Sequence, residues 1–156
     1  MTRIDPGPPI VVGERERAAL VQRFAAEEDV VAAYLFGSQA RGQAGPLSDV
    51  DLGVWLDPAL DRDRRWKRQL DLIGLGTGTL RTNEVQVIVL NDAPPLLTHR
   101  VLRDGIVLAD SDPPQRVRLE TDAIIRYLDT MPLREEMSRG LRQRMAEGNY
   151  GRPRRA

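Results

Sequence analysis

The chain has 156 residues, of which 41% are hydrophobic and 29% are charged, and its formal net charge at pH 7 is zero. This length allows one domain with a hydrophobic core, and the lack of cysteine excludes disulfides and thiolate metal sites. The even charge balance and an aromatic content of 4% argue against direct nucleic-acid binding. Because neither a signal peptide nor a bilayer-spanning stretch is visible, we expect no membrane contact and a cytoplasmic location.

The N-terminal third predicts a helix, a strand and a turn. A Pro/Gly-rich surface segment is expected over 1–13, and apolar residues at helical spacing then predict a helix over 14–28. The β-branched run VVAAYLF predicts a buried strand over 30–36. Ser38 is the expected N-cap of a short helical turn within the loop 38–48.

The middle of the chain continues the alternation of strands and helices. A strand is expected over 49–56, followed by a helix from Pro58 to about Leu72 with Trp66 packed inward. The glycine-rich stretch GLGTGTLRTN over 74–83 predicts a loop or a frayed helix end. It is not interpreted as a phosphate loop, because it precedes a strand instead of following one.

The next elements are a strand over 84–90, a helix from near Pro94 to just before Gly105, and a strand over 106–110; Asn91 or Asp92 is the expected cap of this helix. A C-terminal helical segment over 113–147 follows, with a break at Pro132, and a basic tail over 148–156 ends the chain. Four arginines cluster on the last helix, where they suit either an acidic partner, RNA or a solvated end: Arg134, Arg139, Arg142 and Arg144. The alternation predicts an α/β fold whose core, over 14–112, is a mixed four-stranded sheet flanked by helices.

Two aspartates lie at the head of the second predicted strand. Asp49 and Asp51 alternate with Val50, so their side chains share one face, about 6.6 Å apart along the strand. Neighbouring carboxylates repel each other, and a divalent cation that also binds phosphate oxygens relieves the repulsion. This pattern favours a phosphoryl-transfer site.

The turn before this strand suits the same chemistry. Gly37 allows close backbone approach, Ser38 and the following N–H groups can hold a triphosphate, and Arg41 can neutralise charge. The simpler interpretation is that Ser48 and Asp49 cap a turn. A second candidate, His99, is either a general base or a helix-surface or interface residue, and its lack of a partner in the sequence favours the latter.

The stretch GSQARGQAGPLSDVDLGV resembles the motif of the minimal nucleotidyltransferase (MNT) family, the small branch of the polymerase-β nucleotidyltransferase superfamily. That motif is GS, ten residues, then DxD, within GSxARGxAxxxSDxDLxV. The similarity extends through VIVLNDAPPLLTHRVLRDGIVL and RYLDTMPLREEM.

The resemblance implies a polymerase-β-like nucleotidyltransferase fold and an antitoxin role. Such an antitoxin transfers AMP from ATP, with Mg²⁺ or Mn²⁺, to a tyrosine hydroxyl of a cognate HEPN toxin, with which it forms a hetero-oligomer. The resemblance places metal binding at Asp49 and Asp51, and nucleotide binding at a set of four residues: Gly37, Ser38, Arg41 and Ser48.

One position departs from the family pattern. The third catalytic carboxylate belongs on the next strand, where QVIVLN places Gln86. An amide can offer an oxygen to a metal but cannot accept a proton at pH 7. Glu84 lies two residues earlier and is the nearest alternative acid. Two functions therefore stay open: AMP transfer, or inhibition of the toxin by binding alone. Transfer to a small molecule is less suited to the chain, because no residues remain to build an acceptor domain.

Overall fold

The structure, a computed structural model, describes residues 10–45 and 48–148, so most of the basic tail expected over 148–156 and most of the N-terminal segment lie outside the described residues. The elements in chain order are α1 (Glu14–Ala25), β1 (Val30–Phe36), α2 (Gly37–Ala40), β2 (Val50–Leu56), α3 (Arg62–Leu80), β3 (Val85–Val89), the 3₁₀ helix η1 (Leu90–Asp92), α4 (Pro95–Asp104), β4 (Ile106–Asp110), α5 (Pro113–Asp129) and α6 (Met131–Ala146).

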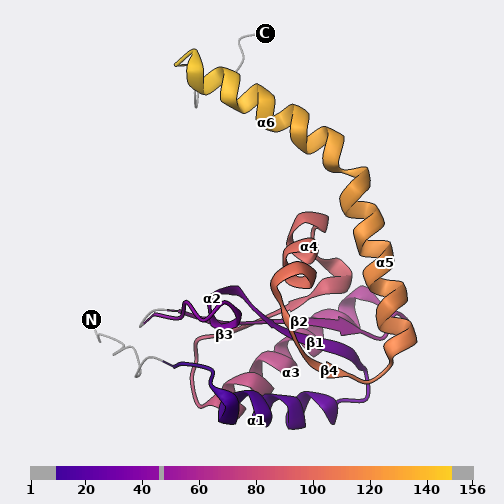
Figure 1. The fold of residues 1–156 in the computed structure, drawn as a ribbon. Coiled ribbons are helices and arrows are strands. Elements are labelled where there is room, and N and C mark those ends of the chain that lie inside the picture. The colour runs from indigo at the N-terminus through magenta and orange to yellow at the C-terminus, as the bar shows by residue number, and fades with distance from the viewer. Residues whose placement is uncertain (1–9, 46–47, 149–156) are drawn as a thin grey trace.

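The four strands form one mixed sheet, as predicted, and their order in it is β3-β2-β1-β4. β1 pairs antiparallel with β2 and with β4, whereas β2 and β3 run parallel. Helices α1 and α3 pack on one face, and α4 and α5 cover the other (Figure 1). Because side chains alternate along β2, Leu52 and Val54 enter the first core, whereas Trp55 enters the second.

The predicted bounds of α3 are wrong at both ends. Pro58 lies in a turn, and the helix begins at Arg62 after Asp61, whose carboxylate accepts a hydrogen bond of 2.8 Å from the Arg64 N–H. The helix then continues through the glycine-rich stretch to Leu80. A Cβ on Gly76 would lie 2.9 Å from Val85 Cγ1, so glycine here allows the helix to approach β3 closely.

Three smaller predictions also differ from the structure. Trp66 is 60% exposed on α3 and does not pack inward. Asn91 does not cap α4: its side chain bonds the backbone N–H and carbonyl of Leu56, at 2.9 and 3.0 Å. The N-cap of α4 is Pro94. Helix α1 ends at Ala25, three residues before the end that the sequence predicted.

Helix α6 forms an arm that extends from the body of the molecule, to which α5 belongs. The predicted break is present, because α5 ends at Asp129 and α6 begins at Met131. Helix α6 projects away from the sheet and its helices (Figure 1), and none of its side chains is buried. Within the described ranges, no helix combines the length and apolar character needed to cross a membrane.

Candidate functional site

Sheet pairing brings the glycine–serine turn against the aspartates. Phe36, the last residue of β1, pairs with Asp51 of β2, so Gly37 lies beside the Asp51 carboxylate. Gly37 has φ +70°, and a Cβ there would lie 2.3 Å from Asp51 Oδ2. Only glycine fits this position, because it tolerates the left-handed backbone and has no Cβ.

The electrostatics of the pair are those of two carboxylates held close together. Partial burial is the largest factor that raises the pKa of Asp51, and the charge of Asp49 raises this pKa further. Arg41 acts in the opposite direction. Burial and the neighbouring carboxylate therefore both disfavour the charged form of Asp51.

Gln86 lies beside both aspartates on the parallel strand β3. It is the register partner of Asp51, and its Nε2 donates a hydrogen bond of 3.0 Å to Asp49 Oδ2. Rotating the amide by half a turn would present its oxygen instead. Gln86 is thus next to the pair, where the family pattern has an acid.

Glu84 lies just before β3, and its side chain is exposed. Its backbone carbonyl accepts a hydrogen bond of 2.8 Å from the Val50 N–H. Among residues 10–45 and 48–148, no group of three His, Asp or Glu side chains could hold a metal ion. The carboxylates of Asp49 and Asp51 fit a divalent ion only if other oxygens, such as those of a triphosphate, complete its coordination.

The N-cap predicted at Ser38 is wrong, whereas Ser48 lies in a turn. Ser38 is not the N-cap of α2, which is Phe36, and Ser38 lies within the helix itself. The Ser48 hydroxyl accepts a hydrogen bond of 2.8 Å from the Gly45 N–H, and the Ser48 N–H donates to the Gly45 carbonyl at 3.1 Å. Ser48 therefore closes a turn, as in the simpler interpretation of the sequence.

Arg41 is an exposed side chain that follows α2. Its Nε donates a hydrogen bond of 3.3 Å to Gln43 Oε1. The hydrogen bond from Arg103 is the main cause that lowers the pKa of Asp104, at the end of α4, and the charge of Arg41 adds to it. Arg41 also opposes the rise in the pKa of Asp51. The role expected for Arg41 in nucleotide binding stays a prediction.

Gln39 is a supporting residue that sequence reasoning missed. It is 5% exposed; its Oε1 accepts a hydrogen bond of 3.0 Å from the Val12 N–H, and its Nε2 donates one of 2.9 Å to the Ile10 carbonyl. The segment before α1 is thereby fixed to the turn. A glutamine in a polar loop carries no signal of such a distant partner.

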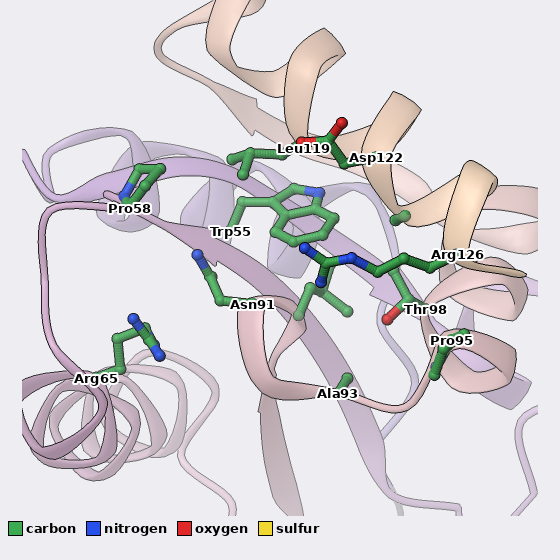
Figure 2. A pocket seen from close by; sticks show the side chains of 12 residues that line it. Trp55, Pro58, Arg65, Asn91, Ala93, Pro95, Thr98, Leu119, Asp122 and Arg126 are labelled. Atoms are coloured by element: carbon green, nitrogen blue, oxygen red, sulfur yellow. The ribbon is translucent and has the colours of Figure 1, made fainter.

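A separate cavity of about 380 Å³ lies at the opposite end of β2. Figure 2 shows Trp55 at its centre, with the Arg126 side chain extending toward it from α5. Asp51 and Trp55 are four residues apart on the strand, or about 13 Å. Between them α4 packs on the sheet, because a Cβ on Gly53 would lie 3.1 Å from Val101 Cγ1. This cavity is therefore separate from the aspartate pair.

His99 is an interface residue, as the sequence favoured. Its ring stacks on that of Tyr127 with a centroid distance of 3.7 Å and an interplanar angle of 5°. The contact joins α4 to α5. This packing accounts for the histidine without a role in proton transfer.

The comparisons with known proteins concern the family and the fold. The model of the family described as polymerase beta, nucleotidyltransferase matches residues 19–114. No curated protein matches the chain.

Similar solved structures come from toxin–antitoxin complexes. A chain of a toxin–antitoxin complex with AMP-PNP is 22% identical, with a TM-score of 0.61, and the match covers 82% of this chain and 97% of that chain. A chain of the complex of a tri-AMPylated Shewanella oneidensis HEPN toxin with an MNT antitoxin is 18% identical, with a TM-score of 0.59, covering 81% and 96%. A chain of the MntA–HepT toxin–antitoxin complex is 18% identical, with a TM-score of 0.59, covering 82% and 97%. These likenesses establish the fold.

Proposed function

Because the chain belongs to the polymerase beta nucleotidyltransferase family, we propose that it is an antitoxin that transfers AMP from ATP to a tyrosine hydroxyl of a cognate HEPN toxin. The observation that carries the proposal is the close approach of the Asp51 carboxylate to Gly37. The pKa of this carboxyl is raised by burial and by the charge of Asp49. Support also comes from the similar fold of a chain in the complex of a tri-AMPylated HEPN toxin with an MNT antitoxin. The protein would act in the cytoplasm.

The proposed step is an in-line displacement at phosphorus. The acceptor hydroxyl oxygen bonds to the α-phosphorus of ATP, the bond from that phosphorus to the bridging oxygen breaks, and pyrophosphate leaves. Asp49 and Asp51 would hold Mg²⁺ or Mn²⁺, which supplies positive charge to the phosphates when bound. The turn at Gly37 and Ser38 lets the phosphates approach the backbone, and Arg41 stabilises their negative charge.

Gln86 sets the expected speed of this step. At pH 7 its amide cannot take the proton of the attacking hydroxyl, so that proton must go to solvent or to another base. Transfer is therefore expected to be slower than with a carboxylate at position 86. The hydrogen bond from Gln86 to Asp49 supports the second candidate function, inhibition of the toxin by binding alone, because it satisfies Asp49 without a metal ion.

One experiment separates the two functions. The protein is incubated with labelled ATP, Mg²⁺ and the purified product of the adjacent gene, and that product is then analysed by mass spectrometry. AMP transfer predicts an added AMP, which the Asp49→Asn/Asp51→Asn variant no longer adds. A stable complex without added AMP would establish binding alone, and labelling by the double variant would refute the metal-site assignment.

A variant at position 86 tests the catalytic defect directly. Replacing the amide by a carboxylate in Gln86→Asp supplies a third acid beside Asp51, so transfer should accelerate about tenfold or more. Gln86→Asn is the control, because it shortens the side chain equally and stays neutral. Equal rates for the two variants would show that position 86 does not limit the reaction.

A further inference from the structure

Helices α5 and α6 carry most of the large hydrophobic side chains that the described residues expose. Eight of these fourteen side chains lie on them: Val117, Ile124, Ile125, Leu128, Leu133, Met137, Leu141 and Met145. Clustered exposed apolar side chains mark protein interaction sites, whereas scattered single ones need no explanation. The arm, α6, has four of the eight and buries no side chain, so it is the candidate surface for a partner.

On α6 the apolar side chains form a ridge, which is defined by Leu133, Met137, Leu141 and Met145. They are spaced four residues apart and are between 39% and 64% exposed. Ridges of this spacing pack into the grooves between the side chains of another helix. Gly140 lies within one turn of Met137 and Leu141, and the Arg144 side chain lies over it, because a Cβ on Gly140 would be 3.7 Å from Arg144 Nη1. The complementary surface is accordingly helical.

The charges near the ridge indicate an acidic partner. Helix α6 has four arginines and two acids, Glu135 and Glu136, and at 100° per residue both acids lie away from the ridge. At 100° per residue, Arg134 and Arg144 are the charged side chains closest to the ridge. If a second copy of α6 packed antiparallel with the two ridges in register, Arg134 would face Arg144, and like charges would oppose the contact. A helical surface bordered by carboxylates fits better.

The base of the arm is held by an elbow formed by His99, Tyr127, Thr130 and Arg134. The Arg134 guanidinium lies 4.0 Å from the centroid of the Tyr127 ring, and its Nη2 donates a hydrogen bond of 2.8 Å to the Tyr127 carbonyl. Its Nε donates to the Thr130 carbonyl at 3.4 Å, and Tyr127 stacks on His99 of α4. The elbow thus ties α6 to the helix that covers the catalytic face of the sheet.

We propose that the ridge on α6 docks the protein whose hydroxyl is modified, a helical protein with an acidic border, and that the elbow sets where this protein is held relative to Asp49 and Asp51. This inference rests on the proposed function, since it assigns the surface that receives the acceptor.

The test uses the full chain, the purified product of the adjacent gene, and two variants with equal charge changes. Met137→Glu/Leu141→Glu interrupts the ridge, and the control Gln143→Glu/Ala146→Glu adds two charges on the opposite face of α6. Because no side chain of α6 is buried, both variants should keep the thermal unfolding of the body. Affinity is measured by isothermal titration calorimetry, and AMP transfer by mass spectrometry.

We expect the ridge variant to bind about tenfold more weakly or worse, and the control to bind within about twofold of the wild type. Equal affinity of the ridge variant and wild type would overturn the docking inference. So would a wild-type homodimer that only the ridge variant dissociates, because the ridge would then face a second copy. No complex with the wild type would also overturn it.

A second measurement keeps this inference separate from the proposed function. Titration of Mg²⁺–ATP into the free protein tests the nucleotide site, which lies outside α6, and should give the same affinity for all three proteins. A wild type that forms the complex but transfers no AMP would refute transfer. In that case the loss of binding by the ridge variant would still establish the docking surface.

Discussion

Two glycines near the candidate site share one backbone conformation but have different surroundings. Gly37 and Gly42 have φ values of +70° and +66°. A Cβ on Gly37 would meet Asp51 Oδ2 at 2.3 Å, whereas a Cβ on Gly42 would have no heavy atom within 4 Å. Alanine substitutions at these two positions therefore separate the free-energy cost of a side chain at positive φ from the cost of a steric clash.

We expect Gly42→Ala to lower the free energy of unfolding by about 1–2 kcal/mol, which is the cost of a side chain at positive φ. Gly37→Ala should cost more and should also displace Asp51, so that affinity for Mg²⁺–ATP falls about tenfold or more. Urea denaturation and calorimetric titration measure the two effects. Equal stability and equal nucleotide affinity of the two variants would contradict the close approach seen here.

The raised pKa of Asp51 predicts a pH dependence of stability. Between the unfolded and the folded pKa, the native state binds more protons than the unfolded state, so stability falls as pH rises through this window. Asp51→Asn removes the effect. Without divalent ions, this variant should match the wild type at about pH 3. At about pH 7 it should exceed the wild type by a few tenths of a kcal/mol, because solvent screens the pair.

The control for this experiment is Asp122→Asn on α5, which removes an exposed aspartate far from the site along the chain. Denaturation in EDTA at the two pH values gives the stabilities. If Asp51→Asn raised the free energy of unfolding equally at both pH values, the charge of Asp51 would not be the source of the increase.

The positions of the candidate site residues are easier to predict from the sequence than the residues that hold the site in place. The predicted strand over 49–56 places Asp51 on β2, as observed, and Asp49 directly before the first strand residue, Val50. Gly37 follows from the need for close approach beside Asp51. Gln39 could not be predicted, because its partners Ile10 and Val12 are more than 25 residues away and a glutamine can bond almost any backbone group. The roles of these residues in nucleotide and metal binding remain predictions.

At the scale of elements, the sheet was predictable and the ends of α3 were not. Each strand is an apolar, β-branched run that ends at a turn residue, so its position is a local property. Glycine is a poor helix former, and a local rule therefore ends α3 before Gly74. The helix continues because Gly76 packs against Val85, a tertiary contact that the local sequence does not contain.

The elbow between α5 and α6 gives a prediction at this scale. Tyr127→Ala removes the ring that lies between His99 and Arg134, so α6 should lose its fixed direction while its ridge stays intact. We expect affinity for the partner within a few-fold of the wild type, and AMP transfer about tenfold slower. Tyr127→Phe keeps the ring and should behave as the wild type in the same assays. Equal transfer by the Ala and Phe variants would show that the elbow does not position the acceptor.

The whole molecule has two parts that are stabilised differently. The body is held by two cores on opposite faces of the sheet, which include the fully buried Leu35 and Ala32 of β1. Helix α6 buries no side chain, and an isolated helix of this length is marginal in water. The unfolding of α6 should therefore cost far less free energy than the unfolding of the body.

Hydrogen exchange measures this difference. In the free protein, amides of α6 should exchange through local opening, whereas amides of β1 should exchange only through global unfolding. Adding the product of the adjacent gene should protect α6 and leave β1 unchanged. Strong protection of α6 in the free protein would mean that the arm is already covered, for instance by a second copy.

The bond network of Gln39 has a practical consequence for anyone producing this protein. Ile10 and Val12 are hydrogen-bonded to the glutamine that follows Gly37 and Ser38, so the chain entering α1 supports the Gly37–Ser38 turn. We expect an affinity tag or a fusion joined close to Ile10 to disturb these hydrogen bonds and loosen the turn. Comparing assays of preparations tagged at the two ends would reveal such an artefact before it is mistaken for a lack of activity.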